Sequence, residues 1–152
     1  MPNFGVDWNA TNTASATVPM GVLQGTAAIA GAIYEVNSGS DATADNAVKY
    51  AILRTTSIGT TSATVVPNDV GMGAATAACI FGTTWNINPT ITASSGLLQW
   101  GQHQRGTYRW VAYDYTKMLR TGCGASTFKG LAWMSVVVSS SFNGVFNIEF
   151  EE

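Results

Sequence analysis

The stretch FNIEFEE, residues 146–152, decides the fold class. Its apolar residues Phe146, Ile148 and Phe150 alternate with asparagine and glutamate. A period of two puts alternate side chains on one face of a strand, whereas a helix needs spacings of three and four. The C-terminus is therefore predicted to be a half-buried strand that ends at the surface.

The same alternation occurs upstream, in residues 32–36 and in residues 46–55. Between them lies GSDATADN, residues 39–46, whose Gly, Ser, Asp and Asn residues favour tight turns. The two segments are predicted to form an antiparallel pair joined by this turn.

A nearly continuous apolar run, LAWMSVVVS, occupies residues 131–139 and is typical of a strand covered on both faces. This strand is predicted to be central in its sheet. Residues 90–100 and 104–113 predict two further strands, and residues 60–66 a weaker one.

Two segments lack strand periodicity. Residues 67–81 contain a possible cap followed by alanines, which predicts a helix of one or two turns through residues 74–79. The polar residues 1–17 are interpreted as an extended arm. The prediction is an all-β chain: one β-sandwich or jelly roll over residues 18–152, with about seven to eight antiparallel strands, an N-terminal arm and at most one short helix.

The composition argues against several classes of partner. Charged residues make up 11% of the chain and its net charge is −2, with the seven Lys and Arg scattered. No basic stripe is present to neutralise phosphates, so nucleic-acid binding is not expected. The most apolar stretch, residues 18–36, contains Pro19, Gln24 and Glu35, which argues against a membrane helix. Low charge suits a subunit packed among neighbours.

The sequence contains no pattern that predicts catalytic, cofactor-binding or metal-binding residues. His103, the only histidine of the chain, lies at a predicted turn and is interpreted as solvent-facing. Asp41 and Asp45 are attributed to turn formation, because a calcium site needs more oxygen ligands than this loop offers. Cys79 and Cys123 stand 44 positions apart with no CxxC, and two buried thiols are favoured over a disulfide.

Aromatic residues outside the predicted strands are candidates for contacts with a partner. Phe4 and Trp8 lie in the predicted arm, and Trp85 lies in a predicted loop. An aromatic residue in a polar, irregular segment has no core of its own to fill. Trp110 and Trp133, on apolar strand faces, are instead predicted to be core.

Arginines supply the remaining contact candidates. If Tyr108 and Trp110 face the core, the alternation turns Arg105 and Arg109 outward, and Arg54 is a third member. Such arginines can make bidentate contacts with carboxylates of a partner. The alternative is solvated arginines that form weak surface pairs.

The chain resembles a family in three stretches: AIYEVNSGSDATADNAVKYAILRTT at 32–56, INPTITASSGLLQWGQHQRGTYRWVA at 87–112, and NIEFEE at 147–152. They resemble small β-rich proteins encoded with the virion genes of tailed bacteriophages. Members of that family carry a GSDATPADN-like turn, an RTT strand, a QRxTxRWVA strand and a terminal FEE. The present turn lacks the proline. The resemblance spans roughly three quarters of the chain, and such local patterns are of moderate specificity.

The resemblance implies a virion structural protein without an active site that decorates or cements the capsid exterior. Its expected partners are the major capsid protein and copies of itself, as a homotrimer that bridges capsomers. The arm, with Phe4 and Trp8, is expected to become ordered on binding. The alternatives are a module that binds carbohydrate or a receptor, such as a host-surface glycan, through Trp85, Trp100 or Tyr113, and a neck or tail structural protein.

Overall fold

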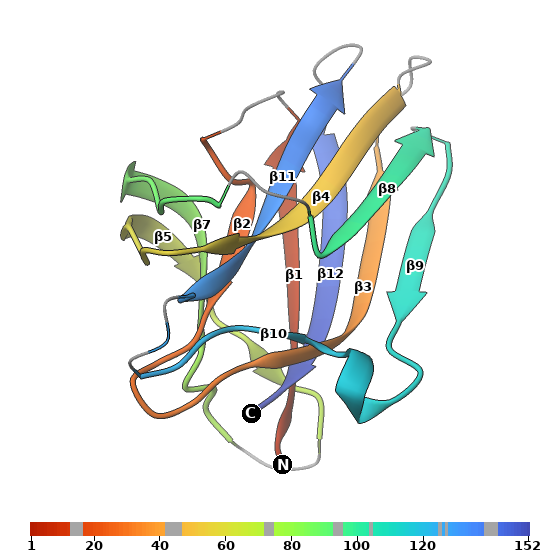
Figure 1. Ribbon diagram of the computed structural model, residues 1–152. Coiled ribbons are helices and arrows are strands. Elements are labelled where there is room, and N and C mark those ends of the chain that lie inside the picture. The colour runs from red at the N-terminus through yellow and green to blue at the C-terminus, as the bar shows by residue number, and fades with distance from the viewer. Residues whose placement is uncertain are drawn as a thin grey trace.

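The structure is a computed structural model. It describes residues 1–12, 17–41, 47–71, 75–92, 96–103, 105–124, 126, 128–138 and 143–152. Within these residues, twelve strands form two antiparallel sheets that face each other as a sandwich (Figure 1). The prediction of an all-β sandwich is confirmed.

Sheet A has the order β10-β3-β12-β1-β6, and β9 also pairs with β3. Its strands are β1 (Asn3–Thr11), β3 (Ala32–Ser40), β6 (Asn68–Asp69), β9 (Tyr108–Val111), β10 (Leu119–Arg120) and β12 (Asn143–Glu151). Sheet B has the order β5-β7-β2-β11-β4-β8. Its strands are β2 (Gly21–Gln24), β4 (Ala47–Thr55), β5 (Thr60–Val65), β7 (Ile80–Ile87), β8 (Leu98–His103) and β11 (Gly130–Val138).

The connectivity identifies the sandwich as a jelly roll. Four strands of sheet A have the order β1-β12-β3-β9, and four of sheet B have the order β2-β11-β4-β8. The chain alternates between the sheets from β1 to β4, and the late strands β11 and β12 insert between the early ones. This nesting of two Greek keys defines the jelly roll. The remaining strands β5, β6, β7 and β10 extend this eight-stranded framework.

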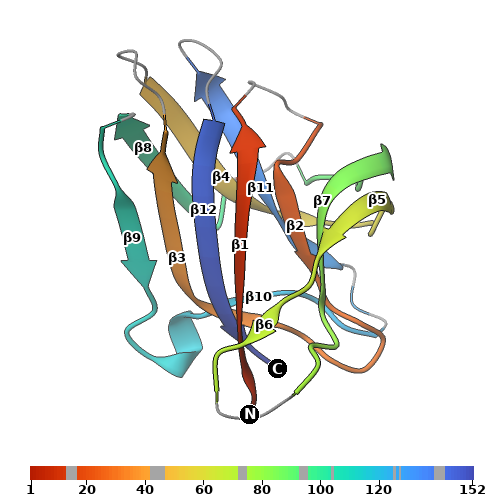
Figure 2. The ribbon, with the colours of Figure 1, turned by 180° about the vertical axis from the view of Figure 1, so that it is seen from behind.

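The predicted N-terminal arm is wrong, because residues 3–11 form β1 in the interior of sheet A. Strand β1 pairs with β12 along its whole length, so the two termini lie side by side (Figure 2). Phe4 and Val6 are fully buried and Trp8 is 5% exposed. These three residues alternate with Gly5 and Asp7. This alternation was missed in the sequence because it is short and the segment around it is polar. Residues 13–16 of the predicted arm lie outside the described residues.

The core between the sheets is rich in aromatic rings and centres on Trp8. Its ring stacks on Phe146 of sheet A at 5.1 Å between centroids and meets Trp133 of sheet B edge-on at 5.5 Å. Phe81 of sheet B lies 4.5 Å from it. Trp8 therefore joins the two layers, and Trp133, which is fully buried, is core as predicted.

The predicted pairing of residues 32–36 with residues 46–55 is also wrong. Strand β3 belongs to sheet A and β4 to sheet B, so the chain crosses from one layer to the other between them. A turn sequence cannot distinguish a hairpin from such a crossing. Residues 42–46 of the predicted turn lie outside the described residues.

The central position of β11 is confirmed, since it lies between β2 and β4. In the described part of the strand predicted at residues 90–100, which lacks residues 93–95, the strand begins at Leu98, and Ile91 makes a bridge to Thr55. The strand predicted at residues 104–113 is reduced to β9.

The helix predicted through residues 74–79 is absent from the described part of that segment, residues 75–79. There the backbone N–H groups of Ala78 and Cys79 donate to the Glu152 carboxylate at 2.8 and 2.6 Å. The C-terminal side chain thus satisfies donors that a helix would have used internally. The 3-10 turn Tyr115–Lys117 is capped by Asp114.

Candidate functional site

The outer face of sheet A carries a row of polar side chains that crosses four strands. The sheet register places Asp7 of β1 beside Asn147 of β12, Asn147 beside Asn37 of β3, and Asn37 beside Arg109 of β9. Glu35 lies two residues before Asn37 on the same face of β3. These five residues are called the polar ladder below.

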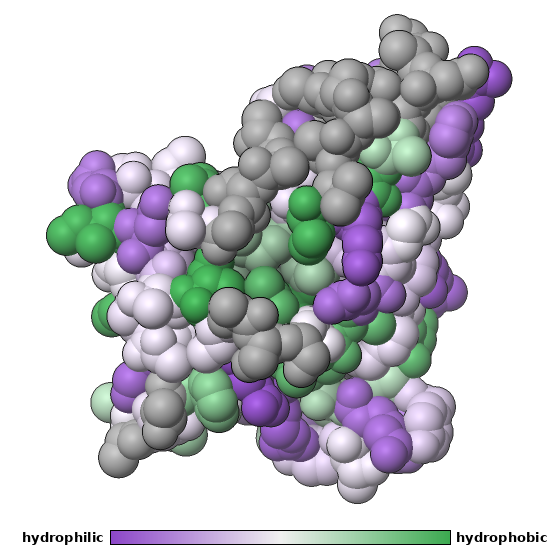
Figure 3. All heavy atoms as spheres, turned by 45° about the horizontal axis from the view of Figure 1, so that its top comes forward, coloured by the Kyte–Doolittle hydropathy of each residue, from purple (hydrophilic) through white to green (hydrophobic). Residues whose placement is uncertain are grey.

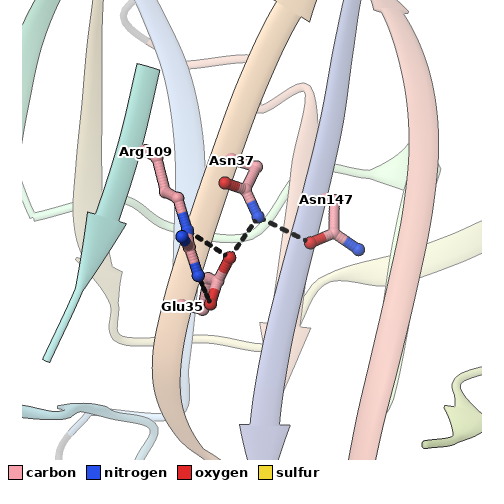
Figure 4. Close-up of polar contacts among 4 residues, drawn as sticks. All are labelled: Glu35, Asn37, Arg109 and Asn147. Atoms are coloured by element: carbon pink, nitrogen blue, oxygen red, sulfur yellow. Dashed lines mark hydrogen bonds and ion pairs between the residues drawn. The ribbon is translucent and has the colours of Figure 1, made fainter. Parts of the chain in front are cut away.

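Hydrogen bonds connect the members of the polar ladder, and Figure 4 shows those among Glu35, Asn37, Arg109 and Asn147. The Arg109 guanidinium donates to both carboxylate oxygens of Glu35, at 2.8 and 2.9 Å. Asn37 donates from Nδ2 to Glu35 at 2.8 Å and to the Asn147 Oδ1 at 3.1 Å. Asn147 in turn donates to the Asp7 carboxylate at 2.9 Å. Each side chain is therefore held in place by its neighbours.

The ion pair in the polar ladder shifts the pKa of both partners. The hydrogen bond from Arg109 lowers the pKa of Glu35 below its ordinary value, and partial desolvation opposes this effect only in part. The Arg109 pKa is raised by the same contact. The Glu35 side chain is 14% exposed and that of Arg109 67% exposed, so the guanidinium covers the carboxylate from the solvent side.

A hollow of about 360 Å³ lies beside the polar ladder. Four ladder residues line it, all except Glu35, together with Gly39, Thr107 and Val145. Gly39 pairs with Val145, two residues along from the Asn37–Asn147 pair, so both belong to the next row of the sheet. The hollow is thus part of the same outer face.

The outer face of sheet B differs, because apolar side chains are packed on it. Val22, Ala132 and Met134 are buried there, outside the main core, against Leu53, Trp85 and Ile91. In Figure 3, apolar residues gather in the middle of the visible surface. The name apolar face is used below for Val22, Leu53, Trp85, Ile91, Ala132 and Met134, together with strands β2, β4, β7 and β11.

Charge separates the two faces as well. The strands of sheet B contain no aspartate or glutamate, whereas those of sheet A contain Asp7, Glu35, Asp69, Glu149 and Glu151. On β4, Lys49 is exposed between the buried Val48 and Tyr50, so it points outward from sheet B. Several apolar residues of this sheet and its flanking segments are partly open: Ile87 is 65%, Ile80 48%, Val136 43% and Leu97 37% exposed.

The arginines predicted as contact residues are not gathered at one place. Arg109 projects outward from β9, as the alternation predicted, and binds Glu35 of its own chain. Arg105 is exposed directly after β8. Arg54 belongs to the other sheet, where its guanidinium lies over the Phe128 ring at 4.8 Å. The grouping of Arg54 with the other two is therefore wrong.

The aromatic contact candidates are mostly internal. Phe4 and Trp8 lie in the core, so their assignment as anchors on a mobile arm is wrong. Trp85 lies on β7 rather than in a loop and belongs to the apolar face, with its ring over Gly82. Trp100 is buried and stacks on Tyr108 at 4.7 Å. Tyr113, 79% exposed, remains open to a partner.

The groups with nucleophilic or acid–base chemistry are dispersed. His103 is exposed, as predicted, but it is the last residue of β8 and does not lie in a turn. Cys79 is buried and Cys123 exposed, and both are free, so the expectation of two buried thiols holds for Cys79 alone. Burial raises the pKa of the Cys79 thiol. Asp41 is exposed, and Asp45 lies outside the described residues.

Other kinds of site are absent from the described part of the chain. Among those residues, no three His, Cys, Asp or Glu side chains are grouped so that they could hold a metal ion. No helix there is long and apolar enough to cross a membrane.

Sequence reasoning missed Asp7, Asn37, Gly39 and Asn147. Asparagine and glycine are depleted in strands, so their outward positions in β3 and β12 were an available signal. Comparisons of the chain with family models, curated proteins and solved structures found no match.

Proposed function

We propose that the chain is a structural protein of a tailed-bacteriophage virion that decorates or cements the outer capsid surface. Its partners are the major capsid protein and copies of itself, associated as a trimer that bridges capsomers. The sequence resemblance motivates this proposal, and the jelly roll is compatible with it, because this fold recurs in viral capsid domains.

The difference between the two outer faces is the observation that carries the proposal. A subunit fixed to a shell needs one face that tolerates burial and one that remains hydrated. The acid-free strands of sheet B, with Val136 and Leu97 partly open, suit burial against another protein. The acids and hydrogen-bonded amides of sheet A suit contact with water.

The charges on sheet B indicate the chemistry of the surface that it meets. Lys49 is exposed on β4, and the strands of sheet B contain no carboxylate that could neutralise it. Burial of an unpaired ammonium is costly, so the partner surface should be apolar with a carboxylate opposite Lys49. We assign this surface to the major capsid protein.

The copy number in the virion is the first test of the proposal. Mass spectrometry or cryo-electron microscopy of purified virions should find copies on the order of hundreds on the shell, as capsid symmetry requires. A low copy number at one vertex would instead indicate a neck or tail protein and would refute capsid decoration.

The docking face is tested with capsids that lack the protein. Val136→Asp and Lys49→Glu should each weaken binding to such capsids at least tenfold, since each puts an unfavourable carboxylate into the contact. Lys117→Glu, a matched charge reversal on the exposed 3-10 turn, should bind like the wild type. Equal binding by all three variants would exclude the apolar face as the docking surface.

A further inference from the structure

The hollow on sheet A has no role in the proposed docking, since it opens on the opposite layer of the sandwich. Its volume of about 360 Å³ lies at the lower end of the range for small-ligand sites, about 300–1,000 Å³. Its lining combines fixed polar groups with the apolar side chain of Val145, which is 42% exposed.

The absence of a side chain at Gly39 leaves open space in this hollow, and the fold does not require a glycine there. It lies inside β3, where a glycine weakens a strand, and its pairing with Val145 continues the regular register without a bulge. An added Cβ at Gly39 would meet no atom within 4 Å, and its backbone φ is not positive. Neither packing nor backbone conformation explains the glycine. Close approach of a ligand is a recognised reason for a glycine in a strand.

The polar ladder retains hydrogen-bonding capacity of both kinds beside Gly39. The two N–H groups of Asn37 serve Glu35 and Asn147, so its carbonyl oxygen is left as an acceptor. Asn147 has one N–H beyond the one that it donates to Asp7. Arg109 has Nη1 beyond its two bonds to Glu35. Thr107 adds a hydroxyl.

Such mixed donors and acceptors match hydroxyl groups, which both donate and accept. An anion is disfavoured, because the only guanidinium of the polar ladder is already paired and Asp7 contributes a second carboxylate. The ladder side chains are held by one another, so little side-chain freedom is lost when a ligand binds.

We propose that this hollow binds a neutral, polyhydroxylated ligand, namely a saccharide, with Asn37, Asn147, Arg109 and Thr107 as the hydrogen-bonding groups and Val145 as the apolar contact. The ligand lies in the space over Gly39. This places a glycan site on the face turned away from the proposed docking surface.

The experiment is a glycan array of neutral and sialylated oligosaccharides, followed by NMR titration of the strongest neutral binder. Wild-type protein should bind a neutral saccharide, with shift changes at Asn37, Thr107 and Asn147. Gly39→Val should lower the affinity at least tenfold, because its side chain occupies the open space over position 39 in which the ligand is proposed to lie.

Gly101→Val is the matched control. Gly101 lies in β8 of the other sheet, and an added Cβ there also meets nothing within 4 Å. It should bind the saccharide like the wild type. If Gly39→Val does not fold, Asn37→Ala supplies the second variant, with the same expected loss.

Several outcomes would overturn the saccharide site. They are no binding of any neutral oligosaccharide, preference for the sialylated members, or affinity unchanged by Gly39→Val and Asn37→Ala. Capsid binding should be the same for Gly39→Val and the wild type. The glycan site and the docking proposal are therefore tested independently of each other.

Discussion

The two outer faces of this sandwich come from strands that share the same geometry, but they have become different surfaces. On sheet A, outward residues such as Asn37 and Asn147 are hydrogen-bonded to one another and face solvent. On sheet B, the outward Ala132 and Met134 are as buried as the core. An outward position in a strand is therefore not the same as an exposed one.

The cause of the difference lies in β7 and the segment on its C-terminal side. Trp85 folds over Gly82, and Ile91 bridges to Thr55, so side chains from this part of the chain cover the outer side of β2 and β11. Strand β11 is consequently covered on both faces. Its sequence is a nearly continuous apolar run, as is typical of strands covered in this way. Strand β12 has only one covered face and keeps its alternation.

The largest effect is expected from replacing Trp8, whose ring packs against aromatic rings of both sheets. Trp8→Ala should destabilise the fold by about 3–5 kcal/mol, because it leaves a cavity between Phe146 of sheet A and Trp133 of sheet B. Urea unfolding followed by far-UV circular dichroism measures the change.

The neighbouring Asn9→Ala is the control, since Asn9 is exposed on the same strand. It should change stability by no more than about 0.5 kcal/mol. Equal, small effects of both substitutions would mean that β1 is a detachable arm after all.

A second substitution compares the faces directly. Met134→Ala, on the outer side of sheet B, should destabilise the fold by about 2–5 kcal/mol, the range for a buried methionine, because Met134 is 1% exposed. Val145→Ala, on the outer side of sheet A, should cost no more than about 0.5 kcal/mol. If the two losses were equal in urea titrations, the outer faces would not differ in burial.

The fold class could be predicted because it depends on local patterns, namely the alternation in residues 146–152 and the continuous apolar run in residues 131–139. Strand pairing could not, since β3 and β4 look like a hairpin and yet belong to opposite sheets. Which strands pair depends on contacts far apart in sequence, such as Trp8 with Phe146.

The candidate site could be predicted only in part. The outward direction of Arg109 followed from alternation, but its partner Glu35 lies 74 residues away. The row formed by Asp7, Asn147 and Asn37 exists only through the register of three strands that are distant in sequence. Burial of Phe4 and Trp8 was missed because a short alternation of apolar and polar residues resembles a polar arm.

The smallest expected effect concerns the polar ladder alone and depends on pH. The Arg109 contact lowers the pKa of Glu35 from its ordinary value of 4.5, so the folded protein binds this proton less readily than the unfolded chain. The stabilisation is therefore complete above about pH 5 and is lost as pH falls through the lowered folded pKa. Glu35→Gln should show a smaller loss of stability than the wild type between about pH 5 and 3, in urea titrations at low salt. Asp41→Asn, an exposed carboxylate outside the polar ladder, should match the wild-type profile; parallel profiles for Glu35→Gln and the wild type would show that the ion pair adds nothing to the stability of this face.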